Sequence, residues 1–135
     1  MKQKPIEEMT CPLSATLSVL EGKYKIYIIF YLIGRTLRYS QLQKLIPDAT
    51  PKMLSQQLKA LEEQGIINRK LYPVVPPRTD YSLTEKGQSL VPIIFAMYQW
   101  GEEIFRENGK EDYCSLDEIK RMIDAAKLSE SPVHQ

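Results

Sequence analysis

A capped helix followed directly by a β-hairpin is the feature of this sequence that most restricts its possible folds. Thr50 and Pro51 are typical of a helix start, because a threonine hydroxyl can accept a backbone N–H group and proline suits the first helical position. Gly65 is typical of the residue that follows a helix end. Two strand candidates, 66–72 and 78–83, then flank a proline-rich loop, which predicts a hairpin longer than the two-residue kind.

Apolar spacing predicts three helices before this unit, over 13–20, 23–33 and 40–46. We expect Ser40 to be the N-cap of the third helix, because its hydroxyl can accept a backbone N–H group. Residues 36–39 would form a short extended link before it.

Two helices are expected after the hairpin. Thr84 is predicted to cap one long helix that reaches about Glu107, and Pro92 is predicted to kink this helix rather than end it. Ser115 is predicted to begin a last helix that runs to about Leu128.

The resulting order of helices, turn and hairpin is that of a winged helix-turn-helix protein. The predicted fold class is mainly α with a small β-hairpin wing (α+β), with N- and C-terminal dimerisation helices. For 135 residues we expect a single domain over 1–135, with a DNA-reading core of about 36–83. The dimerisation helices would be about 13–21, 85–107 and 115–128.

The helix that starts at Pro51 has one apolar face and one polar face. Leu54, Leu58 and Leu61 fall within a narrow arc and are expected in the core. The side chains expected to contact base edges lie on the opposite arc or at its flank: Lys52, Met53, Ser55 and Gln56. Glutamine can bond adenine bidentately, lysine can reach guanine acceptors, and methionine can contact a thymine methyl group. A polar face that only meets solvent is the alternative, and the order of elements favours DNA.

Other side chains are expected to contact the DNA backbone or to belong to the wing: Arg38, Tyr39, Ser40, Lys59 and Arg78. A surface salt bridge to Asp80 or Glu85 is the alternative for Arg78, and packing is the alternative for Tyr39.

Charge is distributed unevenly along the chain. From Arg35 to Arg78, eight Lys and Arg residues face three acidic residues, a balance of +5. From Glu102 to Gln135, five basic residues face nine acidic ones, a balance of −4. A basic middle segment indicates a polyanion as its partner, although scattered surface charge is an equal alternative.

The chain offers little for catalysis or metal binding. Its two cysteines, Cys11 and Cys114, lack metal-ligand spacing, and its one histidine, His134, lies near the end. No glycine-rich phosphate loop, paired-carboxylate cluster or Ser/His/Asp set is visible. We therefore expect no enzyme activity, no metal and no cofactor. Since no signal peptide or membrane span is visible, we expect a cytoplasmic protein with no membrane partner.

Several motifs make the chain resemble the HxlR-type regulators, a branch related to the MarR group. They cover about Cys11 to Glu103 and include Cys11-Pro12, Gly22-Lys23-Tyr24, Arg38-Tyr39-Ser40-Gln41-Leu42, Pro51-Lys52-Met53-Leu54-Ser55, Tyr72-Pro73, Val75-Pro76-Pro77-Arg78, Tyr81-Ser82-Leu83-Thr84 and Trp100-Gly101. Tyr24 stands where the family usually has tryptophan, so its hydroxyl must find a partner. The resemblance implies a bacterial homodimer that binds operator DNA.

A homodimer would cover the apolar stripes of the terminal helices. The candidate interface residues are Leu13, Leu17, Met97, Trp100, Ile104 and Phe105, and packing within the subunit is the alternative for about half of those on the long helix. A symmetric dimer would present two recognition helices about 34 Å apart to a pseudo-palindromic operator in double-stranded DNA.

The resemblance also implies thiol chemistry, because the cysteine at the position of Cys11 senses electrophiles or oxidants in some members. We hypothesise a reversible disulfide between Cys11 of one subunit and Cys114 of the other. An inert Cys11 is the alternative of equal weight.

Two other functions stay open. One is a ligand-gated regulator that holds a small molecule between the long helix and the core, near Tyr98 and Trp100, although no effector is identifiable. The other is a winged-helix protein-interaction module, which would expose apolar anchors rather than basic and polar side chains on the helix at 51–64.

Overall fold

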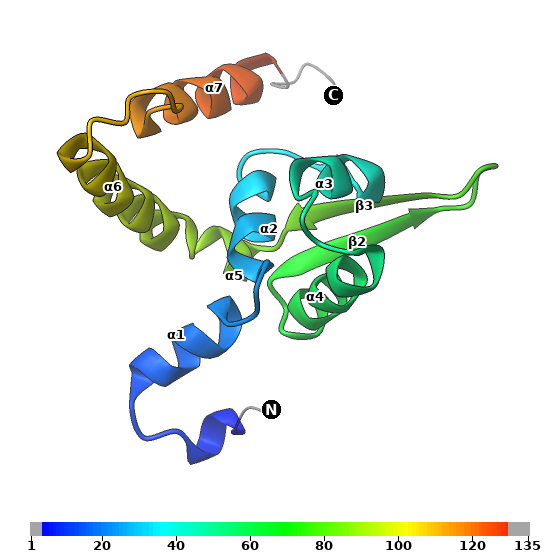
Figure 1. Ribbon diagram of the computed structural model, residues 1–135. Helices are drawn as coiled ribbons and strands as arrows, with labels where there is room; N and C mark the ends of the chain where they lie inside the picture. The colour runs from blue at the N-terminus through cyan, green and yellow to red at the C-terminus, as the bar shows by residue number, and fades with distance from the viewer. Residues whose placement is uncertain (1–3, 130–135) are drawn as a thin grey trace.

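The fold is mainly helical with one small antiparallel sheet, as predicted (Figure 1). The computed structural model describes residues 4–129. In chain order the elements are η1 (Ile6–Glu8), α1 (Pro12–Leu20), α2 (Lys25–Leu32), β1 (Leu37–Arg38), α3 (Tyr39–Leu45), α4 (Pro51–Glu63), β2 (Ile67–Tyr72), β3 (Arg78–Leu83), α5 (Glu85–Gln88), α6 (Val91–Glu107) and α7 (Leu116–Ser129).

A single apolar cluster joins α2, α3, α4 and the sheet. Its fully buried side chains include Ile28 and Ile29 from α2, Leu42 from α3, and Leu54 and Leu61 from α4. Removal of this apolar surface from water is the main force that holds the helix-turn-helix unit together.

The sheet has the strand order β1-β3-β2. β2 and β3 form the predicted hairpin, in which Ile67 pairs with Leu83 and Tyr72 with Arg78. The sequence pattern predicted residues 36–39 only as a link, but Leu37 and Arg38 pair with β3 as a third strand. The sheet therefore anchors the start of α3 to the base of the wing.

The predicted start of the third helix was wrong by two residues. Arg38, not Ser40, is the N-cap of α3, and its backbone N–H donates to Gln41 Oε1 at 2.8 Å. The strand pairing of Arg38 fixes the extended conformation that an N-cap needs, so the helix begins as soon as β1 ends.

The predicted single long helix after the wing is two helices. Thr84 caps α5 as expected, because its Oγ1 accepts from the backbone N–H of Gly87 at 2.9 Å. Pro92 does not kink a continuous helix but lies in the first turn of α6, where its missing N–H costs no hydrogen bond. Leu90 precedes α6 as its N-cap and is buried.

Figure 1 shows α1 at the lower left and the pair α6–α7 at the upper left and top, while the tip of the β2–β3 hairpin points to the right. The start of α6 packs in the core through Ile94, whereas its later apolar side chains are exposed. Ser115 caps α7 as predicted, since its Oγ accepts from the backbone N–H of Glu118 at 3.2 Å. Among the described residues, no helix is both long and apolar enough for a membrane crossing.

Candidate nucleic-acid interface

The helix α4 has a buried leucine face and an exposed polar face. Leu54, Leu58 and Leu61 are 0%, 2% and 0% exposed. The N-cap Thr50 fixes the start of the helix, because its Oγ1 accepts from the backbone N–H of Met53 at 3.1 Å. The packing of the three leucines leaves the helix only one orientation, so its polar side must face away from the core.

The side chains predicted to contact base edges lie together on that outward side. Lys52, Ser55 and Gln56 are exposed, and Lys59 continues the same face one turn later. Met53 is half-buried and packs against the core cluster, so it lies at the flank of the polar face as expected.

Tyr39 links the start of α3 to the start of α4. Its hydroxyl donates to the carbonyl oxygen of Pro51 at 3.1 Å and accepts from Ser55 Oγ at 3.3 Å. Tyr39 also packs against the core cluster, so packing, one of the two interpretations of this residue, is present in the subunit. Arg38 and Ser40 flank it and are exposed.

A second glutamine of α4, which the sequence pattern did not single out, faces inward. Gln57 Oε1 accepts from the backbone N–H of Tyr24 at 3.1 Å, and a side chain at Gly22 would collide with this amide. The hydroxyl of Tyr24 donates to the carbonyl oxygen of Asp48 at 3.0 Å, so it has the partner that it requires. The loop before α2 is therefore tied both to α4 and to the turn that precedes it.

A buried lysine at the start of α2 was also missed by sequence reasoning. Lys25 is 6% exposed, and its Nζ donates to Gln64 Oε1 at 3.1 Å. Gln64 Nε2 in turn donates to the carbonyl oxygen of Ser18 in α1 at 3.1 Å. Burial lowers the pKa of Lys25. Amphipathic spacing could not reveal this network, because it depends on where three helices meet.

The base of the wing holds Arg78 in an ion pair. Its Nε and NH2 groups donate to the two carboxylate oxygens of Asp80 at 3.0 and 2.9 Å, and its guanidinium lies 4.6 Å from the centre of the Tyr72 ring. Of the two carboxylates considered for Arg78, the partner is thus Asp80. Arg38 and Lys70 flank Asp80 on the neighbouring strands. The hydrogen bonds from Arg78 lower the pKa of Asp80.

Both cysteines have free, exposed thiols. Cys11 is the N-cap of α1, whereas Cys114 precedes α7. Desolvation and the neighbouring Glu118 carboxylate raise the pKa of Cys114, so its thiol is a poor source of thiolate. His134, the one histidine of the chain, lies outside the described residues.

The candidate dimer residues are largely uncovered in the single subunit. Leu13 and Leu17 of α1 are 63% and 48% exposed, and Met97 and Trp100 of α6 are 48% and 69% exposed. Ile104 is also exposed. Phe105 differs from the others, because its ring contacts that of Tyr113 edge-on at 5.1 Å within the same subunit.

Comparison with known proteins gives a consistent result. The family model of the HxlR-like helix-turn-helix matches residues 19–109. The uncharacterized HTH-type transcriptional regulator YdeP of Bacillus subtilis is 43% identical over 93 residues, which are 69% of this chain and 73% of YdeP. A solved structure of the redox regulator HypR in its oxidized form matches with a TM-score of 0.66 and 41% identity, covering 69% of this chain and 96% of HypR. The reduced form of the transcriptional regulator YodB from B. subtilis matches with a TM-score of 0.61 and 32% identity, covering 70% of this chain and 94% of YodB.

Proposed function

Because the chain belongs to the HxlR-like helix-turn-helix family, we propose that it binds a pseudo-palindromic operator as a homodimer, with α4 in the major groove. The family makes the chain a transcriptional regulator with a helix-turn-helix domain. In the proposed complex, Lys52, Met53, Ser55 and Gln56 contact base edges. The DNA backbone is contacted by Arg38, Tyr39, Ser40, Lys59 and Arg78.

The polar side of α4 is the observation that supports this proposal most. Its exposed residues include Lys52, Gln56 and Lys59, while every leucine of the helix is buried. A protein-interaction module would need apolar anchors on this side, but among the described residues no exposed large apolar side chain lies on α4, whereas both α1 and α6 carry such side chains. The composition of the surface thus favours DNA over a protein as the partner of α4.

A gel-shift titration with the DNA upstream of the protein's own gene tests the proposal. Gln56→Ala should weaken specific binding by about 1–3 kcal/mol, which is roughly 5- to 150-fold, because an adenine loses a bidentate partner. Gln88→Ala removes an exposed glutamine outside α4 and should leave the affinity unchanged. Equal affinity of the Gln56 variant and the wild type for the operator, at the same salt concentration, would contradict base contact by α4.

The homodimer is supported by the stripe of exposed apolar side chains on α6. Met97, Trp100 and Ile104 recur at the spacing of one helix face, and Leu13 and Leu17 supply a second apolar surface on α1. Exposed apolar clusters of this kind are typical of interaction sites. We place Phe105 at the edge of this interface, since part of its ring already packs on Tyr113.

The redox part of the proposal is a disulfide between Cys11 of one subunit and Cys114 of the partner. In Figure 1 the start of α1 is at the lower left and the start of α7 is at the upper left, well apart, so a bridge within one chain would require a large rearrangement. HypR, a structural neighbour, is named a redox regulator. We infer that Cys11 supplies the attacking thiolate, because the pKa of Cys114 is raised.

Diamide treatment followed by non-reducing electrophoresis tests the disulfide. Two thiols become one S–S bond, and their two hydrogens pass to the nitrogen–nitrogen double bond of diamide. The wild type should form a covalent dimer, and Cys11→Ser and Cys114→Ser should each prevent it. A wild-type band that stays monomeric would exclude the bridge between subunits without affecting the proposal for α4.

A further inference from the structure

The helix α7 lies over α2 with one apolar side chain seated on a glycine. At Gly34, φ is +74° and an added Cβ would lie 2.7 Å from Ile123 Cγ2, so only glycine permits this contact. A hollow lies on each side of it, of about 380 and 500 Å³. Ile33, Gly34 and Ile123 border both hollows, so the side chain of Ile123 lies between two adjoining parts of one groove.

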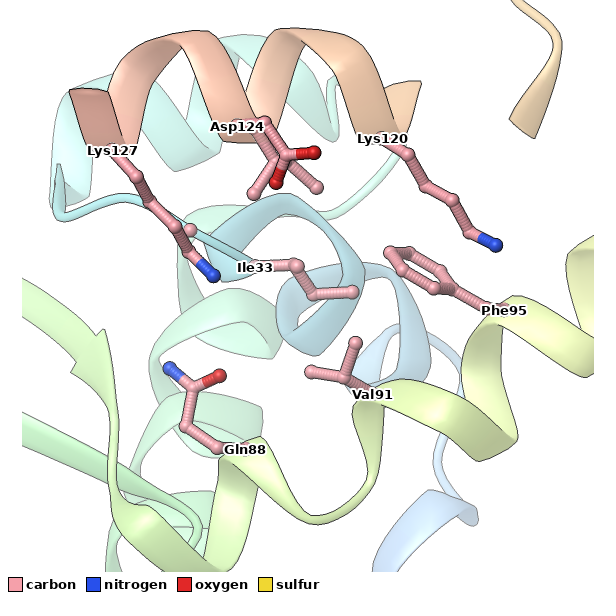
Figure 2. Close-up of a pocket in the computed structure, with 9 residues that line it drawn as sticks. Ile33, Gln88, Val91, Phe95, Lys120, Asp124 and Lys127 are labelled. Carbon is pink, nitrogen blue, oxygen red and sulfur yellow. The ribbon is translucent and has the colours of Figure 1, made fainter. Parts of the chain in front are cut away.

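The smaller hollow has mixed charge. Figure 2 shows Lys120, Asp124 and Lys127 on α7 around an apolar floor that includes Val91 and Phe95. Both acidic and basic groups border this hollow, so it favours no single ligand class.

The larger hollow is walled by aromatic rings. The rings of Phe30 in α2 and Tyr98 in α6 are parallel to within 9°, with centres 5.5 Å apart, and Tyr31 meets Phe30 edge-on at 5.4 Å. Ile119 and Met122 of α7 also line this hollow. Aromatic and aliphatic side chains together suit a flat molecule, because its ring can contact both kinds of group.

One positive charge faces this apolar space. Arg35 is the sole charged side chain among the described residues that line the larger hollow. Its Nε donates to the carbonyl oxygen of Tyr31 at 2.7 Å, which orients the guanidinium, and no ion pair within residues 4–129 engages it. The planar guanidinium suits a carboxylate, which can accept two parallel hydrogen bonds.

We propose that the larger hollow between α2 and α7 binds a small flat aromatic carboxylate, with its ring against Phe30 and Tyr98 and its carboxylate on Arg35. The volume of about 500 Å³ lies within the range of small-molecule sites. Tyr98 is half-buried on α6, whereas the neighbouring Met97 is exposed, so the proposed dimer stripe uses a different side of the helix. Cys114 also borders this hollow, so binding is measured on the reduced protein, and it does not require α4 to bind DNA.

Isothermal titration calorimetry of the full chain with 2-naphthoate tests the site. Wild type should bind saturably, and Arg35→Gln should bind about tenfold or more weakly, because the carboxylate no longer has a cationic partner. Arg121→Gln removes an exposed charge of α7 that borders neither hollow, and it should bind like the wild type.

A neutral ligand of the same shape shows how much of the affinity depends on the charge of Arg35. The amide 2-naphthamide should bind the wild type about tenfold more weakly than 2-naphthoate, and Arg35→Gln should not weaken it further. Met122→Trp, at a residue that is 62% exposed, should fill the hollow and remove binding of both probes, with thermal unfolding checking that the variant folds. No saturable binding to the wild type, or equal loss of affinity in the Arg35 and Arg121 variants, would overturn the proposal.

Discussion

α4 and α6 are both amphipathic, but a single subunit completes the packing of only one of them. Leu54 and Leu58 of α4 are 0% and 2% exposed, whereas Met97 and Trp100 of α6 are 48% and 69% exposed. Burial of a large apolar side chain contributes about 1.5–3 kcal/mol of free energy. The exposed side chains of α6 do not make this contribution in a single subunit. One chain is therefore sufficient to orient α4, whereas the exposed side chains of α6 need a further surface to cover them.

Polar contacts reinforce the same difference. α4 is held by Gln57 at the start of α2, by Gln64 at α1 and by Tyr39 at α3. The later part of α6 is held by the segment at α7: Glu102 accepts from the backbone N–H of Leu116 at 3.2 Å, and the Tyr98 hydroxyl donates to the carbonyl oxygen of Cys114. The orientation of α4 is thus fixed from three sides, whereas the end of α6 is tied to another arm of the subunit.

The largest effect on stability should come from shortening a side chain on the buried face of α4. Leu58→Ala should lower the free energy of unfolding by about 2–5 kcal/mol, because it removes apolar contacts and leaves a cavity. Urea unfolding followed by circular dichroism measures this. Lys59→Ala, its exposed neighbour, should change the free energy by less than about 0.5 kcal/mol. Similar losses of stability in the two variants would show that α4 does not depend on its leucine face.

The second-largest effect should be on the affinity of the proposed dimer, and the stability of the helix-turn-helix unit should change less. Trp100→Ala should weaken the proposed dimer by about 2 kcal/mol or more, roughly 30-fold, because it removes a large aromatic anchor. Sedimentation over a range of protein concentrations measures the dissociation constant. Tyr27→Ala, which removes an aromatic ring that is 54% exposed on α2, serves as the control and should leave the dimer intact.

The sequence predicted the parts of this fold that depend on local pattern. The cap at Thr50, the turn at Gly65 and the leucine face of α4 follow from neighbouring residues, and each is present. The polar side of α4 could be predicted for the same reason, because helix geometry alone opposes it to the leucines.

The features that the sequence did not predict depend on distant partners. Strand β1 exists because Leu37 and Arg38 meet β3, more than forty residues away, and this pairing moves the start of α3. The break before α6 arises because Leu90 turns into the core, which makes Pro92 a first-turn residue. The roles of Lys25 and Gln57 likewise emerge only where α1, α2 and α4 meet.

A smaller effect is expected on the salt dependence of DNA binding, in which the polar side of α4 should take part and α7 should not. If Lys59 contacts a phosphate, Lys59→Ala should reduce the slope of log affinity against log salt concentration by about 1, because one phosphate is no longer neutralised. Gel shifts at several salt concentrations measure this slope. Lys127→Ala, at an exposed position of α7, should leave it unchanged. A slope that responds equally to both lysines would place the phosphate contacts outside α4.

The smallest effect concerns the wing, where Asp80 holds Arg78. Hydrogen bonds from Arg78 lower the pKa of Asp80, so the ion pair stabilises the fold at neutral pH. The contribution is complete above the pKa of an unfolded aspartate, about 3.9, and is lost as the pH falls through the lower pKa of the folded state. Asp80→Asn should therefore slightly lower the melting temperature at pH 7.

The two proteins should converge as acid protonates the wild-type carboxyl group. Thermal unfolding between about pH 2 and pH 7 checks this, and a deficit of Asp80→Asn that persists at the lowest pH would assign the destabilisation to packing rather than to charge. Asp80→Asn also leaves Arg78 without its carboxylate beside Arg38 and Lys70. We therefore expect tighter and more salt-dependent binding to non-specific DNA, with no change in the affinity of the α6 interface.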